Sequence, residues 1–306
     1  MKRRIPQPEM GGERGAIMGE KITVPAVRAR KGGAKLTMVT AYDYPSAKIA
    51  DAAGIDMILV GDSAANVVHG FDDTLAIGLD TMVLHTAAVA RAETSCLVIG
   101  DMPWMSYHLS QEDTVRNAGR LIQEGGAEAV KLEGGRKRIP MIEAIIDAEI
   151  PVMGHIGLTP QSVNAMGGYK VQGRALEDAR ELIDDAKALA HAGVFGLVLE
   201  GVPDAVADMV TKEISVPTVG IGAGPLTDGQ VLVFHDVLGL TFGRNAKFVR
   251  QYADLKQAAI DGLSRYVADV QSGRFPSEQE TYHMSGDVEK MLMEGEISEP
   301  LWPLSY

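Results

Sequence analysis

The chain has 306 residues, of which 46% are hydrophobic and 23% charged, and its formal net charge is −12 at pH 7. This composition is typical of a globular protein, and the acidic balance argues against nucleic acid or an acidic membrane surface as the main partner. A single cysteine, Cys96, excludes an intrachain disulfide framework. No apolar run approaches the ~20 residues of a membrane span and no signal sequence is evident, so we expect a cytoplasmic protein.

Short apolar runs alternate with alanine-rich segments of helical periodicity along most of the chain. Residues 1–20, rich in glycine and charge, are predicted to form an N-terminal arm before this pattern begins. The apolar runs predict strands that start near Leu36, Met57, Cys96, Ala129, Pro151, Gly196, Pro217 and, from a weaker pattern, Val231. Helical segments such as 44–54, 112–126 and 175–193 are predicted to end in left-handed glycine caps at Gly54, Gly125 and Gly193.

Strands that are apolar throughout and alternate with helices predict a parallel sheet covered on both faces. Seven or eight such units favour an α/β fold of the (β/α)8 TIM barrel type, in a single domain over residues 21–285, above an open doubly wound sheet. The first turn, "TAYDYPSAK", lacks the G-x-G-x-x-G dinucleotide fingerprint that such an open sheet often carries. Residues 286–306 are assigned to an acidic C-terminal tail.

Acidic residues fall at the predicted carboxyl ends of five strands. They are Asp43, Asp62, Asp101, Glu133 and Glu200, and His155 ends another strand. In a barrel these ends converge on one mouth, where active sites lie. One such acid is usually a helix cap or a loop residue, but clustered carboxylates repel each other unless a cation or a proton joins them. Oxygen ligands without paired Cys or His favour a hard divalent ion, Mg²⁺ first.

The run "EAVKLEGG" places Lys131 and Glu133 two residues apart, and therefore on the same face of a strand. One interpretation is a structural ion pair, although desolvation often cancels the attraction of such a pair. The other is an ammonium beside a carboxylate–metal cluster, where it binds an anionic substrate and balances developing negative charge. These patterns predict a barrel enzyme that acts on a small anionic substrate, with Mg²⁺, through an oxyanion or enolate, and they leave the substrate open.

Ordered segments between about Lys21 and Tyr282 resemble the ketopantoate hydroxymethyltransferase family. They include "TAYDYPSAKIADAAGID", "LVGDS", "GDMPWMSY", "NAGRLIQEGGAEAVKLEGG", "MGHIGLTPQSVNAMGGYKVQGR" and "LVLEGVP". The resemblance implies transfer of a hydroxymethyl group from 5,10-methylenetetrahydrofolate to 3-methyl-2-oxobutanoate, which forms 2-dehydropantoate in the first committed step of pantothenate and coenzyme A biosynthesis. It also implies a Mg²⁺-stabilised enolate, a (β/α)8 barrel and a cytoplasmic homo-oligomer, often a homodecamer.

The same resemblance implies roles for individual residues. Asp62, Asp101 and Glu133 match the metal-site acids of the family, and Asp62, Ser63, Asp101 and Lys131 match positions that contact the oxo acid. Glu200 matches the proton acceptor. His155 falls near the position at which the family has a histidine that lines the mouth. For His155 itself, contact with the substrate or metal site and a purely structural role are both open. Residues 157–173 form a long, glycine-rich connection that would suit a lid over the mouth.

Three stretches depart from the family pattern. Ala64, Ala65 and Asn66 stand where Leu-Gly-Met is usual, His69 replaces an aliphatic residue, and Trp104-Met105 replaces a common Phe-Gly. They put in question the loop shape beside the substrate and the preference for the oxo acid's side chain. Two alternatives remain: a Mg²⁺-dependent lyase or mutase resembling the isocitrate lyase and phosphoenolpyruvate mutase superfamily, which would need a catalytic cysteine, and a non-catalytic binding barrel, which would lack one or more of these acids.

Overall fold

Eight parallel strands close into a barrel in the computed structural model, which describes residues 20–243 and 245–295. Each strand pairs with its neighbours in chain order, and the last pairs with the first. The strands are β1 (Leu36–Thr40), β2 (Met57–Val60), β3 (Leu97–Asp101), β4 (Ala129–Glu133), β5 (Val152–Gly157), β6 (Gly196–Glu200), β7 (Thr218–Ile221) and β8 (Gly229–Leu232). This arrangement confirms the predicted (β/α)8 barrel. The predicted arm, apart from Glu20, and residues 296–306 of the predicted tail lie outside the described residues.

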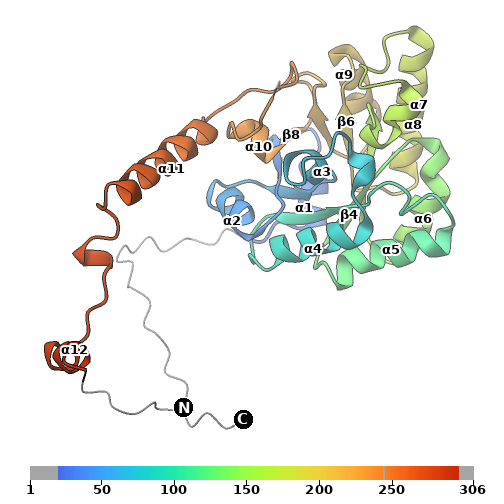
Figure 1. Ribbon diagram of the computed structural model, residues 1–306. Coiled ribbons are helices and arrows are strands. Elements are labelled where there is room, and N and C mark those ends of the chain that lie inside the picture. The colour runs from blue at the N-terminus through green and yellow to red at the C-terminus, as the bar shows by residue number, and fades with distance from the viewer. Residues whose placement is uncertain (1–19, 244, 296–306) are drawn as a thin grey trace. The chain divides into compact units, whose positions relative to one another are not determined.

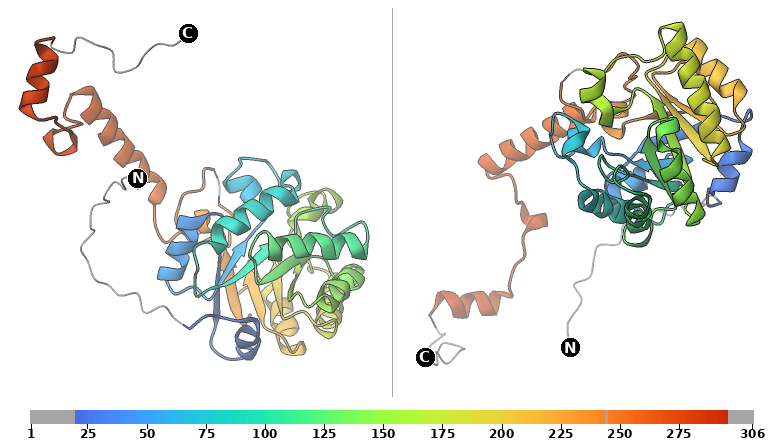
Figure 2. Two further views of the ribbon diagram at one scale, coloured as in Figure 1. Left: turned by 90° about the horizontal axis from the view of Figure 1, so that it is seen from below. Right: turned by 90° about the vertical axis from the view of Figure 1, so that its right-hand side faces the viewer.

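Helices before, between and after the strands surround the barrel (Figures 1 and 2), and the first of them contributes Val27 to the apolar cluster inside it. They are α1 (Val24–Ala29), α2 (Tyr44–Ala52), α3 (Ala64–Val67), α4 (Leu79–Ala90), α5 (Gln111–Gln123), α6 (Ile139–Asp147), α7 (Val163–Met166), α8 (Leu176–His191), α9 (Asp204–Glu213) and α10 (Phe234–Val237). Short 3-10 turns occur at η1 (Thr74–Ala76), η2 (Arg136–Arg138) and η3 (Pro160–Ser162). Among the residues that the structure describes, no helix is long and apolar enough to cross a membrane.

The strands carry two apolar layers because successive side chains point to opposite faces. One layer fills the barrel interior and includes Met57, Ile99, Ala129 and Val198. The other joins the strands to the surrounding helices and includes Val130 and Leu132. Residues two positions beyond an interior residue therefore also face inward, at the end of the strand that opens into the mouth.

Two local predictions are wrong at the level of single residues. Gly54 and Gly193 adopt positive φ as expected, but after α5 the left-handed residue is Gly126, because the Gly125 amide still donates to the carbonyl of Arg120 within the helical turn. The strand predicted from Val231 begins at Gly229 and ends at Leu232, where its pairing with β1 also ends, and the residues that follow form α10.

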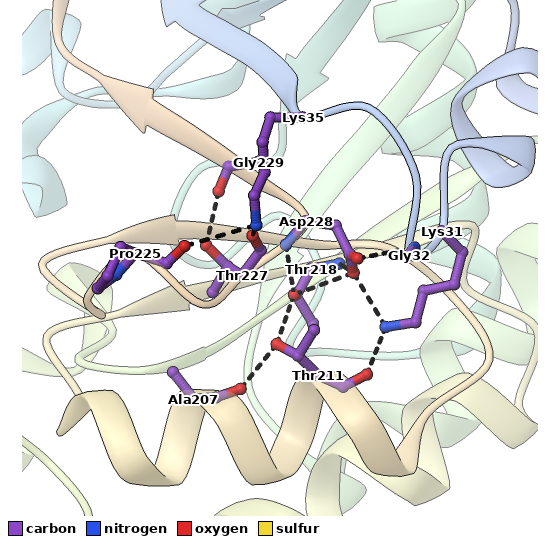
Figure 3. Close-up of polar contacts among 10 residues, drawn as sticks. All are labelled: Lys31, Gly32, Lys35, Ala207, Thr211, Thr218, Pro225, Thr227, Asp228 and Gly229. Atoms are coloured by element: carbon purple, nitrogen blue, oxygen red, sulfur yellow. Dashed lines mark hydrogen bonds and ion pairs between the residues drawn. The ribbon is translucent and has the colours of Figure 1, made fainter.

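Asp228 closes the barrel at the amino ends of the strands, opposite the mouth (Figure 3). Its Oδ2 accepts hydrogen bonds from the Thr218 amide and from Lys31 Nζ, each at 2.9 Å, and its Oδ1 accepts one from the Gly32 amide at 2.9 Å. Burial alone would raise the pKa of Asp228, but these donors lower it below the ordinary value. The carboxylate thus ties β7 and β8 to the segment that enters β1.

The chain divides into two compact units, with the boundary between Ala253 and Asp254. All eight strands belong to the first unit. The second contains α11 (Leu255–Gln271), the 3-10 turn η4 (Glu278–Glu280) and α12 (Gly286–Met293). The boundary falls inside the range 21–285 that the sequence assigned to the barrel domain, and α12 falls inside the range assigned to the tail.

Candidate active site

A small pocket of about 210 Å³ lies at the carboxyl ends of the strands. All seven side chains that the sequence assigned to the site line it: Asp62, Ser63, Asp101, Lys131, Glu133, His155 and Glu200. Asp43, the fifth strand-end acid, is exposed and caps α2, where its Oδ1 accepts the Ser46 amide at 2.8 Å. Four of the five acids at strand ends therefore meet in one pocket.

Strand geometry explains why charged side chains enter an apolar barrel. Lys131 and Glu133 follow the interior residue Ala129 on β4 at intervals of two, so both point inward. By the same spacing Asp101 follows Ile99 on β3, and Glu200 follows Val198 on β6. Asp101, Glu133 and Glu200 are the last residues of their strands, at the mouth, and Lys131 lies two residues before the end of β4.

Lys131 and Asp101 form a buried ion pair, with Lys131 Nζ 3.0 Å from Asp101 Oδ1. Burial alone would lower the pKa of Lys131, but the charges of Asp101, Glu133 and Asp62 raise it, so the amine is an ammonium at neutral pH. For Asp101 the effect of burial is larger than the opposing effect of Lys131, and its pKa is raised above the ordinary value. The pocket therefore contains a fixed positive charge next to buried carboxyl groups whose ionised form is disfavoured by burial.

His155 bridges the two glutamates. Its Nε2 lies 3.3 Å from Glu200 Oε2, and its Nδ1 lies 3.5 Å from Glu133 Oε1 and 3.3 Å from Lys131 Nζ. Burial and Lys131 would lower the pKa of His155, but Glu133 and Glu200 raise it to about 9. These are ion-pair contacts, because neither His155 Nε2 nor Glu133 Oε1 has a hydrogen-bond partner among the described residues. In the imidazolium both nitrogens carry a proton and face carboxylates, and in the neutral ring whose Nδ1 accepts from Lys131 the proton is on Nε2. In both forms Nε2–H faces Glu200.

Gln161, from the loop between β5 and α8, contacts two of the acids. Its Nε2 donates to Asp62 Oδ2 at 2.8 Å, and its backbone amide donates to Glu133 Oε2 at 3.0 Å. Tyr107 donates its hydroxyl proton to Gln161 Oε1. No sequence pattern predicts a role for Gln161 or Tyr107, and the one relevant signal is the unusual length of the 157–173 connection.

Two hydroxyl-bearing side chains complete the wall. The Tyr42 hydroxyl is 2.9 Å from Ser63 Oγ, and this contact holds the serine at the pocket. Thr74, on η1, also lines the pocket, and its Oγ1 is buried with no hydrogen-bond partner among the described residues. A hydroxyl in that state is ready to bond to a polar group of a ligand.

The carboxylates match the donor chemistry of a hard dication. Burial raises the pKa of Asp62, and the neighbouring charges of Asp101 and Glu133 raise it further, which is the repulsion that a bound cation relieves. Glu133 Oε1 is buried without a hydrogen bond among the described residues. In their present positions Gln161 and Lys131 bond to oxygens of Asp62 and Asp101, and no three His, Cys, Asp or Glu side chains in residues 20–243 and 245–295 are arranged around a metal position.

The departures from the family pattern occupy defined places. Ala64 and Ala65 are fully buried in α3, and Asn66 lines the pocket. His69 Nε2 lies 2.8 Å from His85 Nε2, and His85 Nδ1 lies 2.7 Å from the Tyr42 carbonyl, to which it donates. Met105 has φ +69, the left-handed conformation for which a glycine is usual.

Comparison with known proteins agrees with this geometry. The family model for ketopantoate hydroxymethyltransferase matches residues 21–278. The chain belongs to the ketopantoate hydroxymethyltransferase family. It is 54% identical over 269 residues to the 3-methyl-2-oxobutanoate hydroxymethyltransferase of Syntrophomonas wolfei, and the alignment covers 88% of this chain and 98% of the relative. The relative of the same name from Koribacter versatilis is 54% identical over 257 residues, 84% of this chain and 87% of the relative. These matches confirm the predicted hydroxymethyltransferase.

Solved structures show the same fold at low sequence identity. Phosphonopyruvate hydrolase in complex with oxalate and Mg²⁺ aligns with a TM-score of 0.55 at 16% identity, over 90% of this chain and 99% of that one. A 2,3-dimethylmalate lyase of the phosphoenolpyruvate mutase and isocitrate lyase superfamily aligns with a TM-score of 0.53 at 17% identity, over 89% and 98% of the two chains. The catalytic cysteine that the lyase alternative needs is absent from this mouth, since Cys96 precedes β3 at the opposite end of the barrel.

Proposed function

We propose that this chain transfers a hydroxymethyl group from 5,10-methylenetetrahydrofolate to 3-methyl-2-oxobutanoate and forms 2-dehydropantoate. The observation that carries the proposal is the buried Lys131–Asp101 pair in the same small pocket as Glu200. This arrangement offers a cation for the substrate carboxylate and a carboxylate base for its acidic carbon. The names of relatives at about half identity support the same reaction.

The proposed first step is removal of the proton on C3 of the oxo acid by Glu200. The C3–H bond breaks, its electron pair moves toward the keto oxygen, and the ammonium of Lys131 stabilises the negative charge that develops there. His155 presents Nε2–H to Glu200 and so orients the carboxylate that receives the proton.

The second step joins the nucleophilic carbon to the one-carbon unit of the folate. A carbon–carbon bond forms while the two carbon–nitrogen bonds of the methylene group break, and one water supplies the hydroxyl group. The folate nitrogens take up the proton from C3 and the remaining proton of the water, and tetrahydrofolate leaves. Ser63 and the unpartnered hydroxyl of Thr74 are placed to bond to oxygen atoms of the oxo acid, because both line the pocket beside the acids.

We propose that Asp62, Asp101 and Glu133 would hold Mg²⁺. A bound Mg²⁺ would supply Lewis-acid polarisation of the oxo acid. Its charge would also offset the mutual repulsion that raises the pKa of Asp62. We further propose that the enzyme acts in the cytoplasm as a homo-oligomer, an expectation that follows from the family resemblance.

An activity assay tests this proposal directly. Purified protein is incubated with 5,10-methylenetetrahydrofolate and 3-methyl-2-oxobutanoate, with Mg²⁺ or with a chelator, and 2-dehydropantoate is measured by mass spectrometry. We expect product with Mg²⁺ and a large loss of product with the chelator. No product under either condition would contradict the proposed reaction, and equal product under both would contradict the role of the metal.

A further inference from the structure

Gln161 is a buried amide in a loop whose other residues form part of the pocket wall. It belongs to η3, within the 157–173 connection, and its side chain is 95% buried, with 5% relative exposure. Pro160 and Tyr169 of the same connection line the pocket. A long polar side chain is rarely buried unless its amide groups are bonded, so the partners of Gln161 indicate what it does.

The chemistry of these partners fixes the orientation of the amide. The Met102 carbonyl and the Asp62 carboxylate only accept hydrogen bonds, so Nε2 must face them, at 3.1 Å and 2.8 Å. Oε1 therefore faces the Tyr107 hydroxyl, which donates to it. The Tyr107 oxygen in turn accepts the Glu133 amide at 3.3 Å. Reversal of the amide would place Oε1 against two groups that only accept hydrogen bonds and would break both of these contacts.

The backbone of Gln161 adds a second link to the acids. Its amide donates to Glu133 Oε2 at 3.0 Å, while its side chain bonds to Asp62. One loop residue thus contacts carboxylates that follow β2 and end β4. The second oxygen of Asp62, Oδ1, makes no hydrogen bond with a described residue, and Asp62 lines the pocket, so Gln161 leaves that oxygen available to a ligand.

We propose that Gln161 is a positioning residue, which couples the conformation of the 157–173 loop to the orientation of Asp62 and Glu133 and thereby sets affinity for the oxo acid. This inference rests on the proposed function of the pocket. A neutral donor suits the task, since an amide holds Asp62 in one rotamer without adding a charge that competes with Lys131 or a bound cation. Tyr107 supports the role because its hydroxyl fixes Gln161 Oε1.

The test compares Gln161→Met with Tyr107→Phe and the control Gln172→Met. Methionine keeps the length of glutamine and removes its hydrogen bonds, and phenylalanine removes the Tyr107 hydroxyl alone. Gln172 lies in the same loop but is only half-buried, and its side chain bonds to the nearby Lys170 carbonyl instead of to a site acid. For each full-length protein, titration calorimetry measures binding of Mg²⁺ and of 3-methyl-2-oxobutanoate, steady-state kinetics separates KM from kcat, and near-UV circular dichroism checks folding.

We expect Gln161→Met to weaken binding of the oxo acid and of Mg²⁺ at least tenfold, Tyr107→Phe about threefold or more, and Gln172→Met less than twofold. The effects of Gln161→Met and Tyr107→Phe should be non-additive when combined, because both act through one network. Binding by Gln161→Met within twofold of wild type would overturn the inference. If that variant does not fold, Tyr107→Phe decides, and wild-type affinity there overturns it. If the wild type binds Mg²⁺ and 3-methyl-2-oxobutanoate but forms no product, only the proposed function is contradicted. If the wild type binds neither ligand, the proposed function and the role of Gln161 are both contradicted.

Discussion

Lys131→Met removes the buried ammonium that faces three buried carboxylates, and we expect a large loss of stability. At 3.0 Å, the distance from Lys131 Nζ to Asp101 Oδ1, two unit charges in a medium with an effective dielectric constant of ~20 attract each other by about 5 kcal/mol. Removal of one partner of a buried pair leaves the other charge uncompensated, which costs about 3–5 kcal/mol in measured cases. We therefore expect the free energy of unfolding to fall by roughly 3–5 kcal/mol at neutral pH.

The sign of the pH dependence distinguishes this cause from simple loss of packing. Asp62 and Asp101 already have raised pKa values, and loss of the ammonium raises them further. A carboxyl group whose pKa is higher in the folded than in the unfolded state destabilises the fold above that pKa, and the cost declines as pH falls toward the unfolded value of ~3.9. The deficit of Lys131→Met should therefore shrink as the pH is lowered from neutral toward ~3.9.

The assay is urea unfolding followed by circular dichroism at several pH values, with Asp101→Asn and the double variant for comparison. The double variant removes both charges of the pair, so we expect it to recover part of the stability that Lys131→Met loses. A deficit independent of pH, together with additive effects of the two substitutions, would refute an electrostatic origin and indicate packing instead.

Three further predictions concern other parts of the molecule. Asp228→Asn should lower the free energy of unfolding by about 2–4 kcal/mol, because hydrogen bonds to a charged group are lost, and kcat should be unchanged. Because the folded state lowers the pKa of Asp228, the stabilisation is present above pH ~3.9 and disappears as the pH falls through the folded pKa. Urea unfolding should therefore show the stabilities of wild type and variant converging in acid. His155→Gln should slow exchange of the C3 proton of the oxo acid at least tenfold by NMR, and an unchanged rate would remove His155 from the proton transfer. Gly135→Ala should lower the free energy of unfolding by about 1–3 kcal/mol, because a Cβ at this position would clash with the Asp185 carboxylate. The control Gly119→Ala, at a position in α5 where a Cβ would meet open space, should raise the free energy of unfolding by about 0.5–1 kcal/mol in the same assay.

The barrel and most of its site could be predicted because both depend on local sequence. Apolar runs separated by helices determine a parallel sheet, and the two-residue period of a strand determines that Lys131 and Glu133 share a face. Acids at strand ends need only the barrel geometry to meet. Asp43 shows the limit of this rule, since a strand-end acid followed by Ser46 forms a helix cap instead.

Gln161 and Tyr107 could not be predicted because their partners are distant in sequence and their segments have no regular period. Nothing in "GLTPQS" shows that one glutamine bonds to an aspartate 99 residues earlier. The same reason explains the eighth strand: the pairing of Gly229 with Leu36 sets its start, and the apolar run alone places it later. Glycine caps are local, yet one additional turn bond moves the cap from Gly125 to Gly126.

The role of Glu200 as the base that removes the C3 proton is the central claim, and exchange of that proton in D₂O measures it most directly. The experiment incubates 3-methyl-2-oxobutanoate with Mg²⁺ and enzyme, without folate, and follows loss of the C3–H signal by NMR for wild type and Glu200→Gln. Calorimetry on the same samples measures oxo-acid affinity. We predict that the wild type exchanges the proton and that Glu200→Gln does not, with affinity retained within about threefold. Exchange by Glu200→Gln at the wild-type rate would contradict the account.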